Sequence, residues 1–269
     1  MPSTQNLQLV FIHGAGSNAD FWHEQHSAFP DAHYLNLPGH HSLLLTPRPQ
    51  AANLDSLPQG PPHSALRPPH SIDGYADWVA EYLLQNNLTS VSLVGHSMGG
   101  AVALTLALRH PPWLAGLVLT GTGARLRVSS RLLELLHTDY PAAVAMIVRE
   151  SLPPMSEPLT YKQKIRLSGI SRHILRTPQS VTLADYETCD RFDVMPEVGE
   201  IDVPTLCIVG ALDSMTPPKY SHYLHSHIDN SRLEIIEGAG HMLPLEKPEE
   251  YNERVLKFLG DIGNALKYG

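Results

Sequence analysis

The chain has 269 residues, of which 42% are hydrophobic, and its formal net charge is -8. This length suits one large core or two modest domains, and the acidic balance argues against nucleic acid or an anionic membrane as a partner. Its first residues lack an export signal, no stretch is apolar enough to cross a bilayer, and the two cysteines form no disulfide framework. We therefore expect a cytoplasmic protein.

A glycine-rich loop, residues 13–17, follows the first predicted strand, Gln8–Ile12. Glycines let the backbone of such a loop approach a substrate closely. A phosphate-binding loop is the alternative, but no Lys-Ser or Lys-Thr pair follows. We expect the amide of Ala15 to serve as one donor of an oxyanion hole, and His13 to hold the loop through hydrogen bonds.

A segment dense in proline, residues 46–70, comes after a predicted strand that ends near Leu37. Its lack of periodicity is typical of a solvated loop stiffened by proline. The alternative is that it leans over the mouth of a site, because it leaves the strand at the carboxyl end. Beyond it, residues 71–85 carry apolar side chains at helical spacing, which predicts a helix with Ser71 as its N-cap.

Residues 94–100, Val-Gly-His-Ser-Met-Gly-Gly, directly continue an apolar strand. To lift a serine hydroxyl clear of a sheet, the backbone must turn sharply from strand to helix, and the residues two before and two after need almost no side chain. Gly95 and Gly99 meet this need around Ser97. The pattern predicts Ser97 as a nucleophile and the amide of Met98, at the start of the next helix, as the second oxyanion donor.

Residues 122–198 have helical spacing that prolines interrupt, which predicts several short helices forming a cap over the sheet. Their apolar side chains either face a substrate or pack with one another, and the spacing leaves both interpretations open. The side chains concerned are Leu132, Leu133, Leu135, Leu136, Val144, Met146 and Ile147. An apolar cap favours a substrate with a hydrophobic acyl or aryl group.

An acid and a histidine follow the last two predicted strands. Asp213 comes after the apolar residues 204–210, and His241 comes after residues 232–236 and a loop of small residues. The order serine, aspartate, histidine is typical of one hydrolase topology and differs from that of the common serine proteases. We predict that His241 takes the proton from the serine, while Asp213 orients the imidazole and stabilises its charged form.

Three other acids compete with Asp213 for this role. Asp202 precedes its strand, and therefore lies at the wrong end of a parallel sheet for a site formed at carboxyl ends. Asp190 and Asp193 flank Arg191, so we expect them to pair locally with that side chain instead.

These motifs together resemble the α/β-hydrolase superfamily, and look closest to its bacterial esterase, perhydrolase and carbon–carbon hydrolase branch. The likeness runs from about Leu7 to Leu259. It is carried by His13-Gly14 with Trp22 and by residues 35–40, 94–100, 210–213 and 238–241. It implies a mostly parallel eight-stranded sheet with helices on both faces, a cap after the strand ending near Thr120, and no cofactor. Dehalogenases and epoxide hydrolases of the family have an acid at the elbow, so Ser97 counts against both.

We therefore expect a hydrolase core of residues 1–121 and 199–269, a helical cap of residues 122–198 and the proline-rich loop insertion. The expected reaction is cleavage of a small carboxylic ester with a hydrophobic group, through an acyl-enzyme. The alternatives are a perhydrolase, a carbon–carbon hydrolase or lyase using the same residues, and a non-catalytic ligand receptor. No metal is expected, because the histidines of residues 222–227 put only two imidazoles on one helix face. The oligomeric state stays open.

Overall fold

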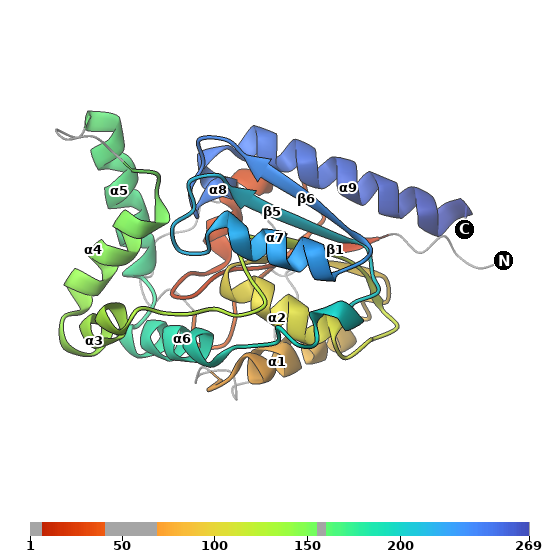
Figure 1. Cartoon of the computed structure of the whole chain (residues 1–269), viewed down its shortest axis with the longest axis horizontal. Helices are drawn as coiled ribbons and strands as arrows, with labels where there is room; N and C mark the ends of the chain where they lie inside the picture. Colours follow the sequence, from red (N-terminus) through yellow and green to blue (C-terminus); the bar gives the residue numbers. More distant parts are fainter. Residues whose placement is uncertain (1–6, 41–68, 155–159, 269) are drawn as a thin grey trace.

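The computed structural model of the chain describes residues 7–40, 69–154 and 160–268. A sheet of six strands forms the centre of this part of the molecule (Figure 1). The strands are β1 (Gln8–Ile12), β2 (His33–Leu35), β3 (Val91–His96), β4 (Leu114–Thr120), β5 (Thr205–Gly210) and β6 (Ser231–Ile236). They have the order β2-β1-β3-β4-β5-β6, and every neighbouring pair is parallel. The predicted α/β class with a parallel sheet is confirmed.

The predicted number of eight strands is wrong for the described residues, which form six. Each strand predicted from the sequence forms one of these six strands, whereas the number eight rests on the family resemblance alone. Strands β3 and β5 are buried at every position. This burial is expected for parallel strands that are covered by helices on both faces.

Helices cover both faces of the sheet. Successive residues of a strand point to opposite faces, so each strand contributes apolar side chains to both sides. In β1, Val10 and Ile12 belong to one buried apolar cluster and Phe11 to another. The first cluster includes α1 (Ile72–Gln85), α2 (Met98–Ala107) and α7 (Pro218–His227). The second includes the 3-10 helix η1 (Ala19–Gln25), α8 (Leu243–Glu246) and α9 (Pro248–Tyr268). A short 3-10 helix, η4 (Val198–Glu200), precedes β5.

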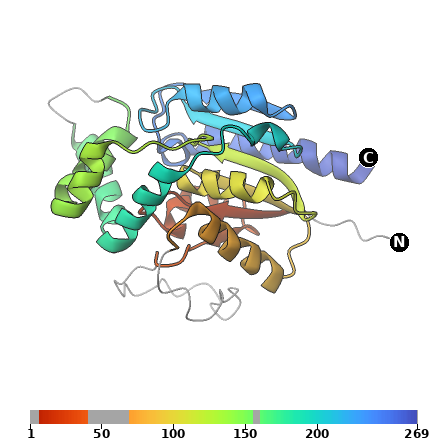
Figure 2. The same ribbon diagram turned by 60° about the horizontal axis from the view of Figure 1, so that its bottom comes forward.

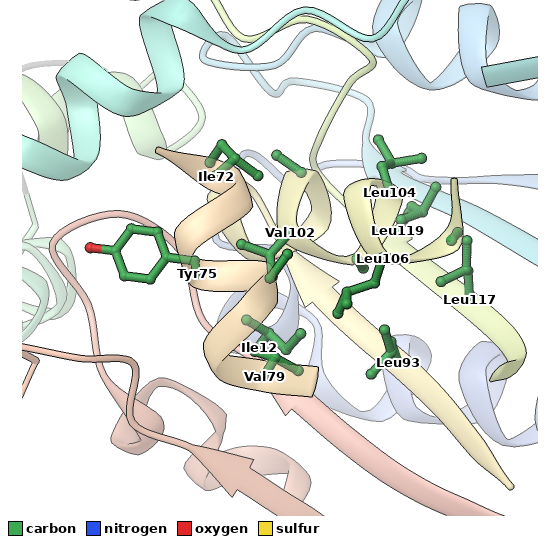
Figure 3. Close-up of a cluster of buried hydrophobic side chains, with 14 of the residues drawn as sticks. Ile12, Ile72, Tyr75, Val79, Leu93, Val102, Leu104, Leu106, Leu117 and Leu119 are labelled. Carbon is green, nitrogen blue, oxygen red and sulfur yellow. The ribbon is translucent and has the colours of Figure 1, made fainter. Parts of the chain in front are cut away.

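The first cluster fixes α1 and α2 against the strands that carry the candidate site. Leu93 and Leu117 from the sheet belong to the same cluster as Val102 of α2 and Val79 of α1 (Figure 3). Tyr75 differs from these residues, because its hydroxyl points away from the other labelled side chains (Figure 3). The phenol oxygen is therefore free to reach polar groups beyond the apolar layer.

Helix α1 begins where the sequence predicts. The Ser71 side chain accepts a hydrogen bond of 3.1 Å from the amide of Gly74, which satisfies one of the free donors of the first turn. The predicted apolar positions of this helix are all buried: Ile72, Tyr75, Ala76, Val79 and Leu83. The expected helix after the elbow is also present, as α2.

Four α-helices of the described residues lie between β4 and β5, and we call residues 130–191 the helical insert. They are α3 (Ser130–Thr138), α4 (Tyr140–Ser151), α5 (Tyr161–Ile174) and α6 (Gln179–Arg191). Both ribbon views show the insert at one end of the molecule, with the end of α9 at the opposite end (Figures 1 and 2). Ser129 and Asp139 cap the first two helices by accepting backbone N–H groups.

Of the proline-rich segment predicted at residues 46–70, all but Pro69 and His70 lies outside the described residues. Among the described helices, none is both long and apolar enough to span a bilayer.

Candidate active site

The candidate site lies where the order of the sheet reverses. Because β1 lies between β2 and β3, the connections that leave β1 and β3 run to opposite sides and open a crevice at the carboxyl ends of these strands. A cavity of about 610 Å³ occupies this position and is lined by Ala15, Ser97 and His241 of the core. The insert supplies Ile170 and Tyr186 to the same cavity. Its volume is in the range of small-molecule sites.

Ser97 occupies a strained turn between β3 and α2. Its backbone has φ 51° and ψ -116°, a conformation that residues with side chains seldom adopt. A Cβ atom at Gly95 would lie 2.3 Å from the carbonyl oxygen of Gly99, and one at Gly99 would lie 2.2 Å from that of Ile12. Both positions therefore require glycine, and the turn directs Ser97 toward the cavity that it lines.

Asp213 follows β5 and is held by four hydrogen bonds. Its Oδ1 accepts from the amides of Met215 and Thr216, each at 2.9 Å, and its Oδ2 accepts from the Thr216 hydroxyl at 2.9 Å and from His241 Nδ1 at 2.9 Å. Burial alone would raise the pKa of this carboxyl, but the neighbouring His241 and the donated hydrogen bonds outweigh burial and lower it. Asp213 is therefore held as a carboxylate.

His241 is fixed through both its ring and its main chain. Because Nδ1 donates to the Asp213 carboxylate, Nε2 carries the free lone pair of the neutral ring. The amide of His241 donates to the carbonyl of Ser151 at 2.9 Å, and its carbonyl accepts from His96 Nε2 at 2.9 Å. His241 and Ser97 line the same cavity.

His96, the neighbour of Ser97, holds this arrangement in its neutral form. Burial, aided by the nearby His241, lowers the pKa of His96 to about 3. Its ring stacks on Phe21 with the centroids 4.5 Å apart, and its Nε2 donates to the backbone of His241. The side chain thus ties the strand that precedes Ser97 to the loop that carries His241.

The loop after β1 approaches the candidate nucleophile closely. A Cβ atom at Gly14 would lie 3.2 Å from Cβ of Ser97. The amide of Gly16 donates to Asp185 at 2.8 Å, and that of Ser17 donates to the carbonyl of Gly14 at 3.3 Å. No described residue accepts a hydrogen bond from the amide of Ala15, which lines the cavity.

The second predicted oxyanion donor, the amide of Met98, is the first N–H group of α2. The first N–H groups of a helix have no acceptor within the helix and lie at the positive end of its dipole. His13 holds the loop after β1 as predicted. Its Nδ1 donates to the carbonyl of Gly14 at 2.8 Å, and its Nε2 accepts from the amide of Leu37 at 3.2 Å.

The rival acids lie elsewhere. Asp193 forms an ion pair of 3.5 Å with Arg125, and Asp190 accepts from the amide of Val128 at 3.0 Å. The predicted pairing of these acids with Arg191 is wrong for the described residues. The Arg191 guanidinium reaches the carbonyl of His70 and the hydroxyl of Thr188 instead. Asp190 and Arg191 are adjacent on α6, and adjacent side chains of a helix do not face each other.

Sequence patterns did not identify two sets of residues that support the site. Thr216 donates to Asp213 through both its amide and its hydroxyl, and its position three residues beyond an aspartate at a strand end is the signal that could have found it. The contact between Asp185 and Gly16 joins residues 169 apart, which no local pattern reveals.

The apolar residues predicted for the cap either line the cavity or pack with other apolar side chains. Ile147 lines the cavity. The other six pack within the insert or against the neighbouring core: Leu132, Leu133, Leu135, Leu136, Val144 and Met146. Further along the insert, Ile170, Ile174 and Tyr186 line the cavity, and periodicity alone did not single them out.

The histidine cluster near the end of α7 has local partners. His225 Nδ1 lies 2.9 Å from the hydroxyl of Ser231, and the ring of His227 stacks on Tyr223. Within residues 7–40, 69–154 and 160–268, no group of three or more His, Cys, Asp or Glu side chains has the geometry to hold a metal ion.

Comparisons with known proteins agree with this geometry. A family model described as the alpha/beta hydrolase family matches residues 9–254. A pimeloyl-[acyl-carrier protein] methyl ester esterase of Neisseria meningitidis serogroup C is 32% identical over 68% of this chain and 73% of its own length. A putative 2-succinyl-6-hydroxy-2,4-cyclohexadiene-1-carboxylate synthase of Bacillus subtilis is 29% identical over 68% of this chain and 71% of its own length.

A solved structure described as that of a thermophilic esterase has a TM-score of 0.73 and 34% sequence identity, and the match covers 95% of this chain and 90% of that one. The family model spans nearly all of the sheet and of the helical insert. The fold, the order of the motifs and the relatives lead to one conclusion: the chain is an enzyme of the alpha/beta hydrolase family.

Proposed function

We propose that this enzyme hydrolyses small carboxylic esters through an acyl-enzyme, with Ser97 as nucleophile, His241 as base and Asp213 as the orienting acid. The observation that carries the proposal is the hydrogen bond of 2.9 Å between His241 Nδ1 and Asp213 Oδ2, in a cavity that Ser97 also lines. A binding site alone does not require an oriented base beside a hydroxyl on a strained turn. The esterase names of two relatives support the same reaction.

In the first half of the reaction, the Ser97 hydroxyl oxygen attacks the ester carbonyl carbon while His241 Nε2 takes the hydroxyl proton. The carbonyl oxygen becomes an anion, and the amides of Ala15 and Met98 donate to it. When the intermediate collapses, the bond to the alcohol oxygen breaks and His241 returns the proton to that oxygen. Free alcohol leaves, and the acyl group stays on Ser97.

In the second half, water attacks the acyl carbon while His241 Nε2 takes one of its protons. The same two amides hold the second oxyanion. Collapse breaks the bond to the Ser97 oxygen, which receives the proton from His241. The products are a carboxylic acid and the free enzyme, so the sum of both halves is one ester and one water converted to one acid and one alcohol.

The substrate we propose carries a hydrophobic group beside the ester. Apolar side chains from both the insert and the core line the cavity, among them Ile147, Ile170, Phe21, Met242 and Leu245. We also propose that the helical insert acts as a cap, because cavity residues come from α4, α5 and α6. A cytoplasmic location stays a prediction, with which the free, buried Cys189 and Cys207 agree.

The proposal is tested with a graded series of p-nitrophenyl esters. The wild-type enzyme should turn these esters over, and Ser97→Ala should abolish turnover, because alanine has no hydroxyl to acylate. Ser168→Ala is the matched control, since Ser168 is exposed on α5 and does not line the cavity. Turnover retained in Ser97→Ala, or lost equally in the control, would contradict the proposal.

Carbon–carbon bond cleavage or elimination is the second candidate, and the synthase name of the Bacillus subtilis relative favours it. The same serine and histidine can remove an acidic proton or attack a ketone. An enzyme inert toward the ester series but active on a vinylogous 1,5-diketone would support this candidate. Stoichiometric ligand binding without turnover of either class would support a receptor.

A further inference from the structure

A buried carboxylate on the helical insert contacts the turn that carries the candidate oxyanion donor. Asp185 of α6 is fully buried. Its Oδ2 accepts from the amide of Gly16 at 2.8 Å and from His40 Nε2 at 2.7 Å, and its Oδ1 accepts from the Tyr75 hydroxyl at 2.6 Å. One side chain of the insert therefore binds three separate parts of the core.

The ring of His40 carries protons on both nitrogens in this arrangement. Its Nε2 faces the Asp185 carboxylate, and its Nδ1 lies 2.9 Å from the carbonyl of Pro38, so both partners are acceptors. Burial by itself would lower the pKa of His40, but the charge of Asp185 and these hydrogen bonds raise it above its usual value. Asp185 and His40 therefore form a buried ion pair with its hydrogen bonds satisfied.

Tyr75 completes the surroundings of the carboxylate. This is the hydroxyl that points away from the apolar cluster in Figure 3. A buried carboxylate is costly unless its lone pairs are hydrogen-bonded, and here the amide, the imidazolium and the phenol all donate to it. Moving Asp185 away from Gly16 would remove one of these hydrogen bonds from a buried charge, which is energetically unfavourable.

Gly16 follows Ala15 directly in the chain, so a contact that fixes Gly16 also restrains Ala15. Residues 14–17 form a tight turn closed by the Ser17 amide and the Gly14 carbonyl, 3.3 Å apart, and Gly16 has φ 63°. The amide of Gly16 belongs to the peptide plane that joins it to Ala15. A hydrogen bond from Asp185 to this amide holds that plane, and so limits rotation of Ala15 at the edge of the cavity.

The insert holds the same turn from a second side. A Cβ atom at Gly16 would lie 2.9 Å from the methyl group of Thr182 on α6, so the helix packs directly on the turn. His173 Nε2 of α5 lies 2.8 Å from the Ser17 hydroxyl, and the hydroxyl of Thr177 donates to the Ser17 carbonyl at 3.3 Å. The turn is thus clamped by the insert at two consecutive residues.

We propose that Asp185, charge-paired with His40, is a positioning residue that holds the Ala15 amide in the geometry required by the oxyanion. Asp185 does not touch the cavity, so it acts through Gly16 and not on the substrate. The inference rests on the proposed function, because it needs an oxyanion at this position. It makes the insert part of the catalytic geometry, beyond any role in substrate selection.

The test compares Asp185→Asn with Asp190→Asn. Both aspartates lie on α6 and accept a backbone amide, but Asp190 contacts Val128, away from the cavity. The substrate is a p-nitrophenyl ester. The probe is a trifluoromethyl ketone with the same acyl chain, whose carbonyl carbon bonds to the Ser97 oxygen while the serine proton passes to His241, leaving an anionic oxygen in the oxyanion hole. The matching alkyl ether, which forms no oxyanion, reports ground-state binding.

In Asp185→Asn, kcat should fall about 10-fold to 100-fold. This fall in kcat should be no larger than the fall caused by removing one oxyanion donor. The inhibition constant of the ketone should rise in proportion. The KM of the ester and the affinity for the ether should stay near the wild-type values, and Asp190→Asn should leave all four quantities unchanged. His40→Gln removes the paired charge from the other side and should shift kcat and ketone binding in the same direction.

A wild-type kcat and ketone affinity in folded Asp185→Asn and His40→Gln would overturn the inference. An equal loss of ketone and ether binding would also overturn it, since that result indicates a general loosening of the fold. Should Asp185→Asn fail to fold, His40→Gln decides by the same criteria. The proposed function fails separately: the wild-type enzyme would then hydrolyse no ester, or Ser97→Ala would still do so.

Discussion

At the scale of single residues, the hydrogen bond between Asp213 and His241 determines which ring nitrogen is free to act as a base. The Asp213 carboxylate accepts from Nδ1, so the lone pair lies on Nε2. Thr216 and the backbone hold the carboxylate in its turn. We therefore expect Asp213 to be necessary for the tautomer of His241, and not for binding of substrate.

Replacing Asp213 by asparagine tests this role. The amide group of the new side chain can donate to Nδ1, which stabilises the wrong tautomer, so kcat should fall about 10⁴-fold with little change in KM. Asp193→Asn should keep wild-type turnover, because Asp193 pairs with Arg125 outside the cavity. Steady-state kinetics on a p-nitrophenyl ester provides the measurement, and a larger loss in Asp193→Asn would move the acid to that residue.

Residues of the site that follow strands could be predicted from the sequence, whereas those held by distant segments could not. Ser97 and Asp213 each come directly after an apolar run, and parallel strands bring their carboxyl ends to one edge. Asp185 lies in the middle of a helix whose sequence gives no sign of a buried partner. Its environment depends on how the insert packs on Gly16, and packing between distant segments leaves no local pattern.

At the scale of elements, the cavity lies at the boundary between the helical insert and the core. Helix α5 contributes Ile170 and Ile174, while the core contributes Met215 and Met242 on other parts of the wall. Side chains of α5 that line the cavity can therefore alter which acyl groups enter, whereas Asp185 of α6 contacts the turn that carries Ala15. This separation predicts that substitutions in α5 change specificity.

Ile170→Ala should shift the preference of the enzyme toward longer acyl chains. The shortened side chain enlarges the cavity, and one methylene group in such a pocket changes specificity about 10-fold. The measurement is the ratio of kcat/KM for p-nitrophenyl octanoate and butyrate. Leu132→Ala removes a buried side chain of the insert that does not line the cavity, and should leave this ratio unchanged. A similar shift in both variants would argue against a direct contact.

The elements themselves were predictable where hydrophobic periodicity and caps agree. The strands predicted from the sequence correspond to the six strands, and Ser71 caps the helix expected after it. The eight strands implied by the family resemblance are wrong for the described residues, because a family's typical sheet does not determine the number of strands in each member. Periodicity also could not decide which apolar side chains of the insert face the cavity, because core and cavity positions are equally hydrophobic.

At the scale of the whole molecule, several buried histidines couple stability to pH. Burial lowers the pKa of His13 well below its usual value, that of His96 to about 3 and that of His173 to about 4. These rings are neutral in the folded protein, but unfolding frees them to bind protons near their usual pKa of about 6.5. The unfolded state therefore binds more protons between pH 5 and 6.5, and stability should rise with pH in this window.

Two other groups contribute outside that window. The raised pKa of His40, which arises because the charge of Asp185 outweighs burial, gives a contribution that is complete below about pH 6.5 and is lost as pH rises through the folded value. The pKa of Asp213 is lowered, because its partners outweigh burial, so its contribution is present above about pH 3.8 and is lost as pH falls through the folded value.

Urea unfolding between pH 5 and 6.5 tests the sign of this dependence. The free energy of unfolding should increase with pH, by at most about 1.4 kcal/mol per pH unit for each buried histidine. His173→Gln removes one such group, so its slope should be smaller than that of the wild-type protein. A free energy that falls with pH, or an unchanged slope in His173→Gln, would show that burial does not keep these rings neutral.

The proposed catalytic unit is tested most sharply by covalent labelling with a fluorophosphonate, whose phosphorus bonds to an activated serine oxygen as fluoride leaves. Mass spectrometry of the digested protein should find one adduct, on the peptide that contains Ser97, at a rate that matches the loss of esterase activity. His241→Ala should react far more slowly, because the base that activates the serine is gone. An adduct on another residue, or equally fast labelling without His241, would contradict the proposal that Asp213, His241 and Ser97 form one catalytic unit.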